Sequence, residues 1–350
     1  MRIGIPTESK VREGRVGLIP DAVGALVALG HPVYIEAGAG VLSGFSDSDY
    51  SQLGGILVPD AAALYGQAEL IVKVKEPTQQ DLSLLKQHHT LFCYLHLAAA
   101  PQLSQVLQQI GLTAVAFETV ESQGKLPLLA PMSDIAGRLA VQIGAHLLHA
   151  PAGGKGILLG GLAGCQRGKV VILGGGVAGY NAAKIAVGLG AEVVVFERKR
   201  DRQEMLLTLG ENITTLYPFP ALLAQQVVAA DLLIGAVLLT GQKAPRLVSH
   251  AWVKKMEPGS VIVDIAIDQG GCIETIRPTD YLNPTYLVDG VIHFGVTNMP
   301  GAVPKTASLA LSAALLPYVE KMAHSDWEKD PELKGAINIK QGKIVHAALL

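Results

Sequence analysis

Short apolar runs alternate with amphipathic stretches along most of this chain. Apolar runs that end in polar or glycine-containing turns are typical of strands buried on both faces of a parallel sheet. The predicted strands are 2–5, 32–36, 70–75, 90–96, 113–117, 170–173, 192–196, 214–217, 232–237 and 260–266. Stretches with helical spacing lie between many of them, at 21–29, 61–65, 102–110, 177–189 and 307–318. This alternation predicts an α/β fold.

A longer apolar stretch, 132–148, interrupts the alternation. Ile135, Leu139 and Ile143 recur in it at helical spacing, which predicts one long helix. The glycine-rich segment 151–165 follows it; such a loop is often functional or mobile, and a plain surface connection is the alternative. We interpret the helix as a connection between two domains, for which a chain of 350 residues has room.

The bulk composition is that of a globular protein with a large core, since 49% of the residues are hydrophobic and 17% are charged. The net charge of −2 provides neither a basic surface for nucleic acid nor an acidic tail for a basic partner. The first residues lack the apolar region of a signal peptide, and 309–319 is too short to span a membrane. Scattered cysteines indicate reduced thiols in a cytoplasmic protein; they are Cys93, Cys165 and Cys272.

The stretch 169–180 combines a predicted strand, a glycine turn and the start of a helix. Gly174, Gly176 and Gly179 follow the pattern G-x-G-x-x-G, in which the glycines permit a tight turn, close approach of a pyrophosphate and close packing of helix on strand. The next predicted strand ends at Glu197, about 20 residues after the turn, where a carboxylate accepts the adenosine ribose hydroxyls. Together these features predict a dinucleotide site.

Three cations of the first half are candidates for binding an anionic substrate. Alternation along the predicted strand 70–75 places Lys73 and Lys75 on one face near its carboxyl end, where ligands of open α/β sheets bind. The alternative is that both are solvated lysines at the edge of the sheet. The spacing favours this alternative for Lys73 and does not decide between the two for Lys75. Arg15, in a polar loop, offers a bidentate fork for a carboxylate; without further evidence an ordinary surface arginine is favoured.

The candidate proton-transfer groups also follow predicted strands. His96 ends the strand 90–96 and has the chemistry of a general acid or base, although a structural histidine is the more common case. His88 and His89 lie in a polar turn and are expected to be exposed. Asp264 faces the sheet interior or a neighbouring loop, whereas Asp268 lies past a strand end, as a ligand-binding or turn-initiating residue.

Many segments, in order and over nearly the whole chain, resemble those of bacterial alanine dehydrogenases, whose relatives include the nucleotide-binding subunit of proton-pumping transhydrogenase. The segments are GIPTE, Arg15-Val16, GHPVYIEAGAG, VKVKEP, YLHLAA, FETV, LPLLAPMSDIAGRLAVQ, GGKGILLGG, LGGGVAGYNAAKIA, ADLLIGAVL, PGSVIVDIAIDQGGC and TNMPGAVPKT. The resemblance implies two doubly wound, parallel-sheet (Rossmann-like) domains with a cleft between them. Residues 1–128 with 305–350 would form the substrate and catalytic domain, and 129–304 the NAD-binding domain.

The resemblance also implies an activity, the reversible NAD-dependent oxidative deamination of L-alanine to pyruvate and ammonium. Arg15 and Lys75 would bind the substrate, and His96 and Asp268 would be catalytic. No metal is implied, and the enzyme would be a cytoplasmic homohexamer. The residues implied to contact NAD are Ser133, Gly174, Gly176, Val177, Ala178, Gly179, Glu197, Val237, Leu238, Asn298 and Met299.

Two other functions remain open beside this one. A dehydrogenase of another small amino or keto acid, such as glycine and glyoxylate, would share the architecture. A non-catalytic nucleotide-binding module, like the transhydrogenase subunit, is disfavoured because the chain has Lys75, His96 and Asp268 together.

Two positions depart from the family pattern. Glu197 stands where an aspartate is usual and is followed by the basic run 198–200, and Pro218 stands where a serine is expected near the adenine. A carboxylate at position 197 repels a 2′-phosphate, so NAD is favoured over NADP.

Overall fold

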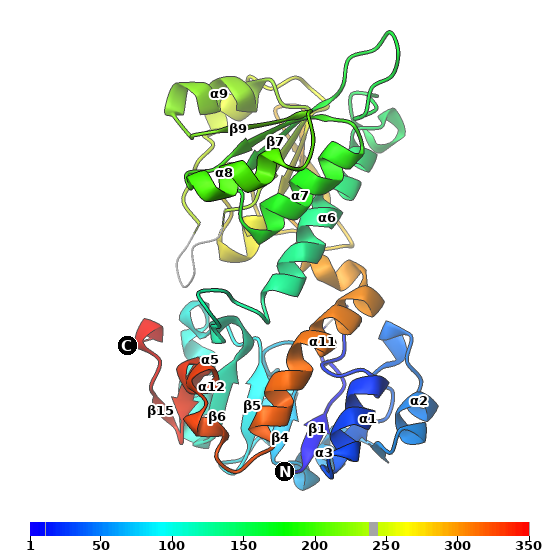
Figure 1. Cartoon of the computed structure of the whole chain (residues 1–350), viewed down its shortest axis with the longest axis vertical. Coiled ribbons are helices and arrows are strands. Elements are labelled where there is room, and N and C mark those ends of the chain that lie inside the picture. The colour runs from blue at the N-terminus through cyan, green and yellow to red at the C-terminus, as the bar shows by residue number, and fades with distance from the viewer. Residues whose placement is uncertain (11, 238–243, 350) are drawn as a thin grey trace. The chain divides into compact units, whose positions relative to one another are not determined.

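The computed structural model describes residues 1–350 apart from 11, 238–243 and 350. The chain forms two compact units (Figure 1). The first consists of Met1–Met132 and Val303–Leu350, and the second of Ser133–Ala302. Each has one sheet with helices against it, so the predicted pair of α/β domains is confirmed.

The first unit contains an eight-stranded sheet with the strand order β15-β14-β6-β5-β4-β1-β2-β3. Strands β1 to β6 are parallel, whereas β14 and β15 extend the sheet in antiparallel fashion beside β6. Its elements are β1 (Ile3–Ile5), α1 (Pro20–Ala28), β2 (Val33–Glu36), α2 (Asp47–Gln52), β3 (Ile56–Val58), α3 (Ala61–Gln67), β4 (Leu70–Val72), α4 (Gln79–Leu84), β5 (Thr90–Cys93), α5 (Pro101–Ile110), β6 (Thr113–Ala116), α11 (Pro304–Met322), α12 (Pro331–Ala336), β14 (Ile337–Lys340) and β15 (Lys343–Ile344).

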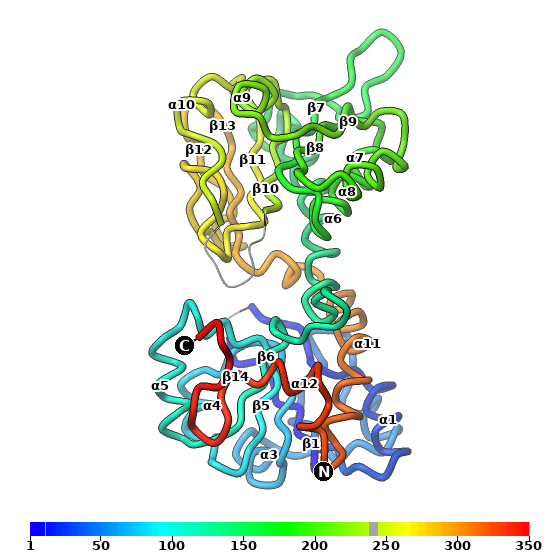
Figure 2. Tube along the Cα trace, turned by 60° about the vertical axis from the view of Figure 1, so that its left-hand side comes forward, coloured from blue at the N-terminus to red at the C-terminus, as the bar shows by residue number. Residues whose placement is uncertain are grey.

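The second unit contains a seven-stranded sheet with the order β12-β13-β11-β10-β7-β8-β9, in which only β12 runs antiparallel (Figure 2). The helix α6 (Ala130–Leu147) leads into it, as the apolar stretch 132–148 predicts. The remaining elements are β7 (Lys169–Leu173), α7 (Val177–Gly188), β8 (Glu192–Phe196), α8 (Arg200–Leu207), β9 (Ile213–Leu216), α9 (Pro220–Val228), β10 (Leu232–Gly235), α10 (His250–Val253), β11 (Val261–Asp264), β12 (Thr285–Val288) and β13 (Val291–Phe294).

Apolar strands account for both cores. Residues of β1, β4, β10 and β11 are buried throughout, as are those of β7 after Lys169, which is what continuous apolar runs in parallel sheets require. No helix of the described residues combines the length and the apolar character needed to cross a membrane.

Several strands end earlier than predicted, because carboxylates take the backbone N–H groups that would continue them. Strand β4 ends at Val72, after which the N–H groups of Val74 and Lys75 donate to Glu8. Strand β5 ends at Cys93, and Glu118 then accepts from two N–H groups. The prediction that Lys73 and Lys75 lie within a strand was therefore wrong.

Candidate active site

The order of strands in the first unit predicts where a ligand would bind. The chain proceeds from β1 to β2 and β3 on one side and returns to β4 on the other, so β1 and β4 are neighbours at a switch point. Ligands of open α/β sheets bind at the carboxyl ends of the strands at such a point. The segments that leave these two strands contain Glu8, Arg15 and Lys75.

Arg15 is buried and forms an ion pair with Glu13. Each residue is 3% exposed. The guanidinium donates from Nε to Oε1 of Glu13 at 2.7 Å and from Nη2 to Oε2 at 2.5 Å, and Nη1 lies 3.1 Å from Sδ of Met132. The interpretation of Arg15 as an ordinary surface arginine was wrong, and the bidentate contact fixes the plane of its fork.

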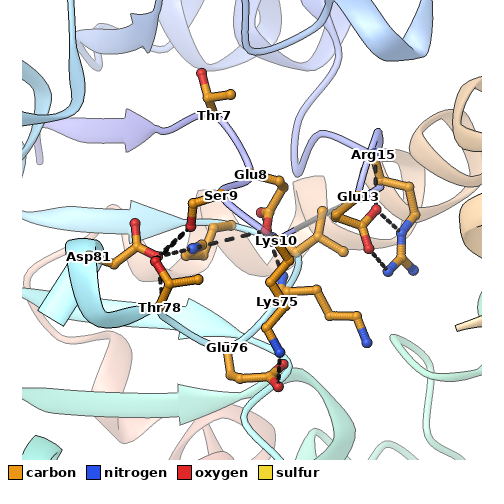
Figure 3. A network of polar contacts seen from close by, with 12 residues as sticks. Thr7, Glu8, Ser9, Lys10, Glu13, Arg15, Lys75, Glu76, Thr78 and Asp81 are labelled. Carbon is orange, nitrogen blue, oxygen red and sulfur yellow. Dashed lines mark hydrogen bonds and ion pairs between the residues drawn. The ribbon is translucent and has the colours of Figure 1, made fainter. Parts of the chain in front are cut away.

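The two lysines after β4, Lys73 and Lys75, have different environments; Lys75 is labelled in Figure 3, together with Glu8 and Asp81. The side chain of Lys73 is fully buried; its Nζ lies 2.7 Å from Oδ2 of Asp81 and 4.0 Å from Oε2 of Glu8. The interpretation of Lys73 as a solvated edge residue was wrong. Lys75 is half-buried, and among the described residues its ammonium has no ion-pair partner. Lys73 is thus a structural cation, whereas Lys75 has an ammonium available to a ligand.

His96 follows β5 in a left-handed conformation, with φ 49° and ψ 38°. Its backbone N–H donates to Oε1 of Glu118 at 2.6 Å, and its Nδ1 lies 3.8 Å from the same oxygen. The imidazole, 49% exposed, stacks on the ring of Tyr94 with 6.0 Å between centroids. Burial raises the pKa of Tyr94 and the nearby guanidinium of Arg15 opposes that rise. Tyr94 therefore lies close to both His96 and Arg15.

In the second unit, the equivalent switch point separates β7 from β10, and the glycine turn follows β7. Gly174 has φ +98°, where a side chain is strained. A Cβ on Gly179 would lie 1.8 Å from the carbonyl oxygen of Gly174, so only glycine permits this packing. Gly176, before the first turn of α7, faces open space: the nearest atom to a Cβ added there would be Nη1 of Arg202, at 3.9 Å. The three roles expected of the glycines are all present, and the turn fits a pyrophosphate.

Glu197 follows β8 and lies against the glycine turn. Its Oε2 accepts from the N–H of Gly175 at 3.0 Å, and Oε1 accepts from those of Arg198 and Lys199 at 2.7 and 2.9 Å. Nη1 of Arg202 lies 3.8 Å from Oε2. Glu197 therefore lies against the turn, and its contact with the ribose stays a prediction.

Asp264 and Asp268 have different environments although only three residues lie between them in the chain. Asp264 is fully buried and accepts from the N–H groups of Ala266 at 2.9 Å and Cys272 at 2.7 Å. Burial raises its pKa to about 6. Asp268 is exposed, and its Oδ1 lies 3.4 Å from the N–H of Asn298. Asp264 thus holds the segment that presents Asp268.

The other predicted cofactor contacts lie in four segments of the second unit. Ser133 is half-buried in α6, one turn before Gly137, which touches the start of α7 so closely that a Cβ there would lie 2.1 Å from the oxygen of Ala178. Val237 lies over Gly174, with Cγ2 3.2 Å from where a Cβ would stand. Val177 is exposed, and Met299 is buried. Leu238 lies outside the described residues.

Sequence reasoning missed three residues of the first unit's site, namely Glu8, Glu13 and Tyr94. The sequence did contain a signal for Glu8. It lies just beyond the first predicted strand, and ligands of open α/β sheets bind at the carboxyl ends of strands, which is the rule that pointed to Lys75 at the end of another strand. The prediction that His89 is exposed was also wrong. The residue is buried, and its Nε2 lies 2.8 Å from the carbonyl oxygen of Tyr65.

Comparisons with known proteins agree with this geometry. Residues 4–136 match the model of the N-terminal domain of alanine dehydrogenase/PNT, and residues 140–347 match that of the C-terminal domain. The chain belongs to the alanine dehydrogenase/PNT family. The alanine dehydrogenase of Bacillus subtilis is 47% identical over 355 aligned residues, covering 100% of this chain and 94% of the relative. That of Methanococcus maripaludis is also 47% identical, with coverages of 100% and 95%.

Solved structures extend the family comparison. An L-alanine dehydrogenase matches with a TM-score of 0.96 and 51% identity, covering 100% of this chain and 98% of that one. A transhydrogenase from Sinorhizobium meliloti matches with a TM-score of 0.86 and 28% identity, with coverages of 99% and 100%. The alanine dehydrogenase family implies a nicotinamide nucleotide cofactor, which the glycine turn and Glu197 fit.

Proposed function

We propose that this chain catalyses the reversible, NAD-dependent oxidative deamination of L-alanine to pyruvate and ammonium. The observation that carries the proposal is the match over the full length to proteins named alanine dehydrogenase, at 45–51% identity. A binding module would need the glycine turn but not the charged residues at the switch point of the first unit.

The second unit supplies the residues to hold NAD, which when bound accepts a hydride from Cα of alanine. The N–H groups at the start of α7 would bind the pyrophosphate, and Glu197 would accept the ribose hydroxyls, which favours NAD over NADP. Further proposed contacts are Ser133, Gly174, Gly176, Val177, Ala178, Gly179, Val237, Leu238, Asn298 and Met299.

The first unit supplies the proposed substrate-binding groups. Arg15 would bind the carboxylate of alanine or pyruvate, with its fork oriented by Glu13. Lys75 would bind the carbonyl, because its ammonium has no ion-pair partner among the described residues. Two fixed cationic groups restrict a small substrate to one orientation, which lowers the entropic barrier to hydride transfer.

Proton transfer is assigned to His96 and Asp268. Hydride loss from alanine leaves an iminium that water attacks, and the resulting carbinolamine must lose and gain protons before ammonium departs. An imidazole that is half exposed can exchange protons with substrate and solvent. The exposed carboxylate of Asp268 is proposed to orient the water.

The decisive experiment measures NADH oxidation by the purified protein with pyruvate and ammonium. We expect turnover with this pair and little with glyoxylate and ammonium; omission of ammonium should abolish the reaction. Faster turnover with glyoxylate or a branched keto acid would favour another substrate, and no turnover with any of these keto acids would leave only the binding module.

The His96→Ala variant tests the catalytic assignment. It should lose turnover by at least a hundredfold while NADH binding, measured by fluorescence, is retained. The matched control is His88→Ala, because His88 is exposed in the same unit and should be dispensable. Near-normal activity of His96→Ala would refute the assignment.

The family resemblance also supports the proposal of a homohexamer in the cytoplasm. Sedimentation equilibrium of the purified chain tests the assembly, and a monomer would contradict it.

A further inference from the structure

Glu8 is a buried carboxylate that joins the two segments at the first unit's switch point. Its side chain is 2% exposed. Its Oε1 accepts from the N–H of Val74 at 2.5 Å, and Oε2 accepts from that of Lys75 at 3.2 Å. Oε2 also lies 4.0 Å from Nζ of Lys73. The carboxylate thus occupies the position of a neighbouring strand for two residues of the segment that follows β4.

These contacts fix the backbone from which the side chain of Lys75 projects. The N–H groups of two consecutive residues are bound by the two oxygens of one rigid, planar group, so the dihedral angles between them are constrained. A carboxylate is the suitable acceptor, because an ionised oxygen forms a stronger hydrogen bond than a neutral one. An amide would present an NH₂ group to one of the two donors, and that N–H would lose its partner.

The site also explains how Glu8 can remain ionised in a buried position. Lys73, on the segment after β4, faces it with the opposite charge and is itself held by Asp81 of α4. Without such a partner, a buried carboxylate takes up a proton. Glu8 and Asp81 share the charge of Lys73, which accounts for a fully buried lysine that contacts no solvent.

We propose that Glu8 is a positioning residue for Lys75: its ionised carboxylate, held by Lys73, fixes the turn after β4 and so directs the ammonium that binds the substrate. The proposal deepens the proposed function, on which the substrate role of Lys75 rests. Glu8 itself touches neither substrate nor cofactor in this assignment.

The arrangement also predicts a dependence on pH near neutrality. Burial raises the pKa of Glu8 to about 7; the charge of Lys73 and the N–H groups of residues 74 and 75 oppose the rise, and Glu13 adds to it. The other titratable groups around Glu8 are Arg15, Tyr65 and Cys93, whose own pKa values it influences. Below pH 7 the protonated carboxyl has lost an acceptor position, so the hold on Lys75 weakens.

The test replaces Glu8 by glutamine and measures amide exchange, lysine reactivity and kinetics. In Glu8→Gln, amide exchange of residues 74 and 75 should be at least tenfold faster. Acetylation of Lys75, followed by mass spectrometry, should change at least threefold, while that of the exposed Lys86 stays constant. The KM for pyruvate should be about tenfold higher than in the parent protein, with a smaller change in kcat. The KM of the parent protein should increase between pH 8 and pH 6, and the variant should lack this increase.

Two further variants make the result specific. Glu36→Gln is the matched control, since Oε2 of Glu36 accepts the N–H of Thr7 on the same segment at 2.8 Å, and it should leave residues 74 and 75 unchanged. Glu8→Asp keeps the charge on a shorter side chain, so its amide exchange, acetylation and KM should lie between those of the parent protein and Glu8→Gln. If Glu8→Gln does not fold, the same measurements are made on Glu8→Asp.

The outcomes separate this proposal from the proposed function. The role of Glu8 is overturned if Glu8→Gln shows the amide exchange of the parent protein at residues 74 and 75. It is also overturned if exchange is faster but the reactivity of Lys75 is that of the parent protein. Both conclusions hold whether or not the variant is active. Absence of turnover in the parent protein refutes the proposed function alone, because exchange and acetylation are measured without substrate.

Discussion

The two switch points use different chemistry at the same place in similar sheets. In the first unit, charged side chains fill the strand ends: Arg15 pairs with Glu13, and Lys73 lies between Glu8 and Asp81. In the second, the turn after β7 consists of glycines and exposes backbone N–H groups at the start of α7. In the proposed function, side-chain charges would bind the small substrate, whereas the shape of the backbone would bind the large dinucleotide.

One device is common to both units. A carboxylate accepts N–H groups of the segment that follows a strand, as Glu8 does after β4, Glu118 after β5, Glu197 after β8 and Asp264 after β11. Each of these segments carries a proposed ligand-binding or catalytic residue. The two units therefore differ in the groups they would present to a ligand, which are charged side chains in the first and backbone N–H groups in the second. They are alike in that carboxylates hold the segments that carry these groups.

The largest effect is expected from filling the space that the glycine turn needs. In Gly179→Ala the new Cβ would meet the oxygen of Gly174 at 1.8 Å, so the turn must change and NADH binding should fall at least a hundredfold. Gly188→Ala, at the end of the same helix with no atom near its Cβ, is the control; it should retain binding and gain about 0.5 to 1 kcal/mol of stability. Normal NADH titration of Gly179→Ala would show that the backbone shape is not required.

The next largest effect separates the two lysines of the first unit. Lys73→Met leaves Asp81 and Glu8 buried without their cation and should lower the free energy of unfolding by about 3 to 5 kcal/mol. Lys75→Met removes no ion pair and should change stability by less than about 0.5 kcal/mol while abolishing turnover. Urea titration followed by Trp327 fluorescence, with Trp252 replaced by phenylalanine, reports on this unit. Equal destabilisation by the two variants would contradict the distinction.

The contrast between these lysines shows what the sequence could and could not provide. The parallel α/β units, the glycine turn and the acid after β8 could be predicted, because each depends on local apolar runs and spacing. The burial of Lys73 could not, since its partner Asp81 comes from α4 and its neighbour Glu8 from the segment after β1. The ends of β4 and β5 were placed too late for the same reason, because their acceptors Glu8 and Glu118 are distant in sequence.

The edge strands illustrate a second limit. Strands β14 and β15 come after α12, and they join the first sheet beside β6 in antiparallel fashion. They are short and follow no regular alternation of strand and helix, so the pattern that identified the parallel strands did not reveal them.

A smaller effect is expected on the pH dependence of the free energy of unfolding, through the buried carboxylate of Asp264 in the second unit. Burial raises the pKa of Asp264 to about 6 from 3.8, so the folded chain binds this proton more tightly than the unfolded chain. That contribution to stability is complete below pH 4 and is lost as the pH rises through 6, amounting to about 3 kcal/mol at most. Asp264→Asn should lack this loss.

The measurement is urea titration between pH 4 and 7 with Trp252 as the reporter and Trp327 replaced by phenylalanine. The exposed carboxylate of Asp201, in the same unit, provides the control variant Asp201→Asn, which should follow the parent. A parallel course of parent and Asp264→Asn would contradict the assignment.

The smallest effect concerns the acid that touches the glycine turn, where the second unit does use a side-chain charge. In Glu197→Gln, the amide keeps one oxygen but presents NH₂ to N–H donors of the turn, so NADH affinity should fall about tenfold, or about 1.4 kcal/mol. Removing the negative charge beside Arg202 should at the same time bring the affinity for NADPH closer to that for NADH. Glu204→Gln, which breaks only an exposed pair with Arg200, should leave both affinities unchanged. If Glu197→Gln loses NADH and NADPH affinity equally, the carboxylate holds the turn without selecting the cofactor, and the backbone alone accounts for recognition in this unit.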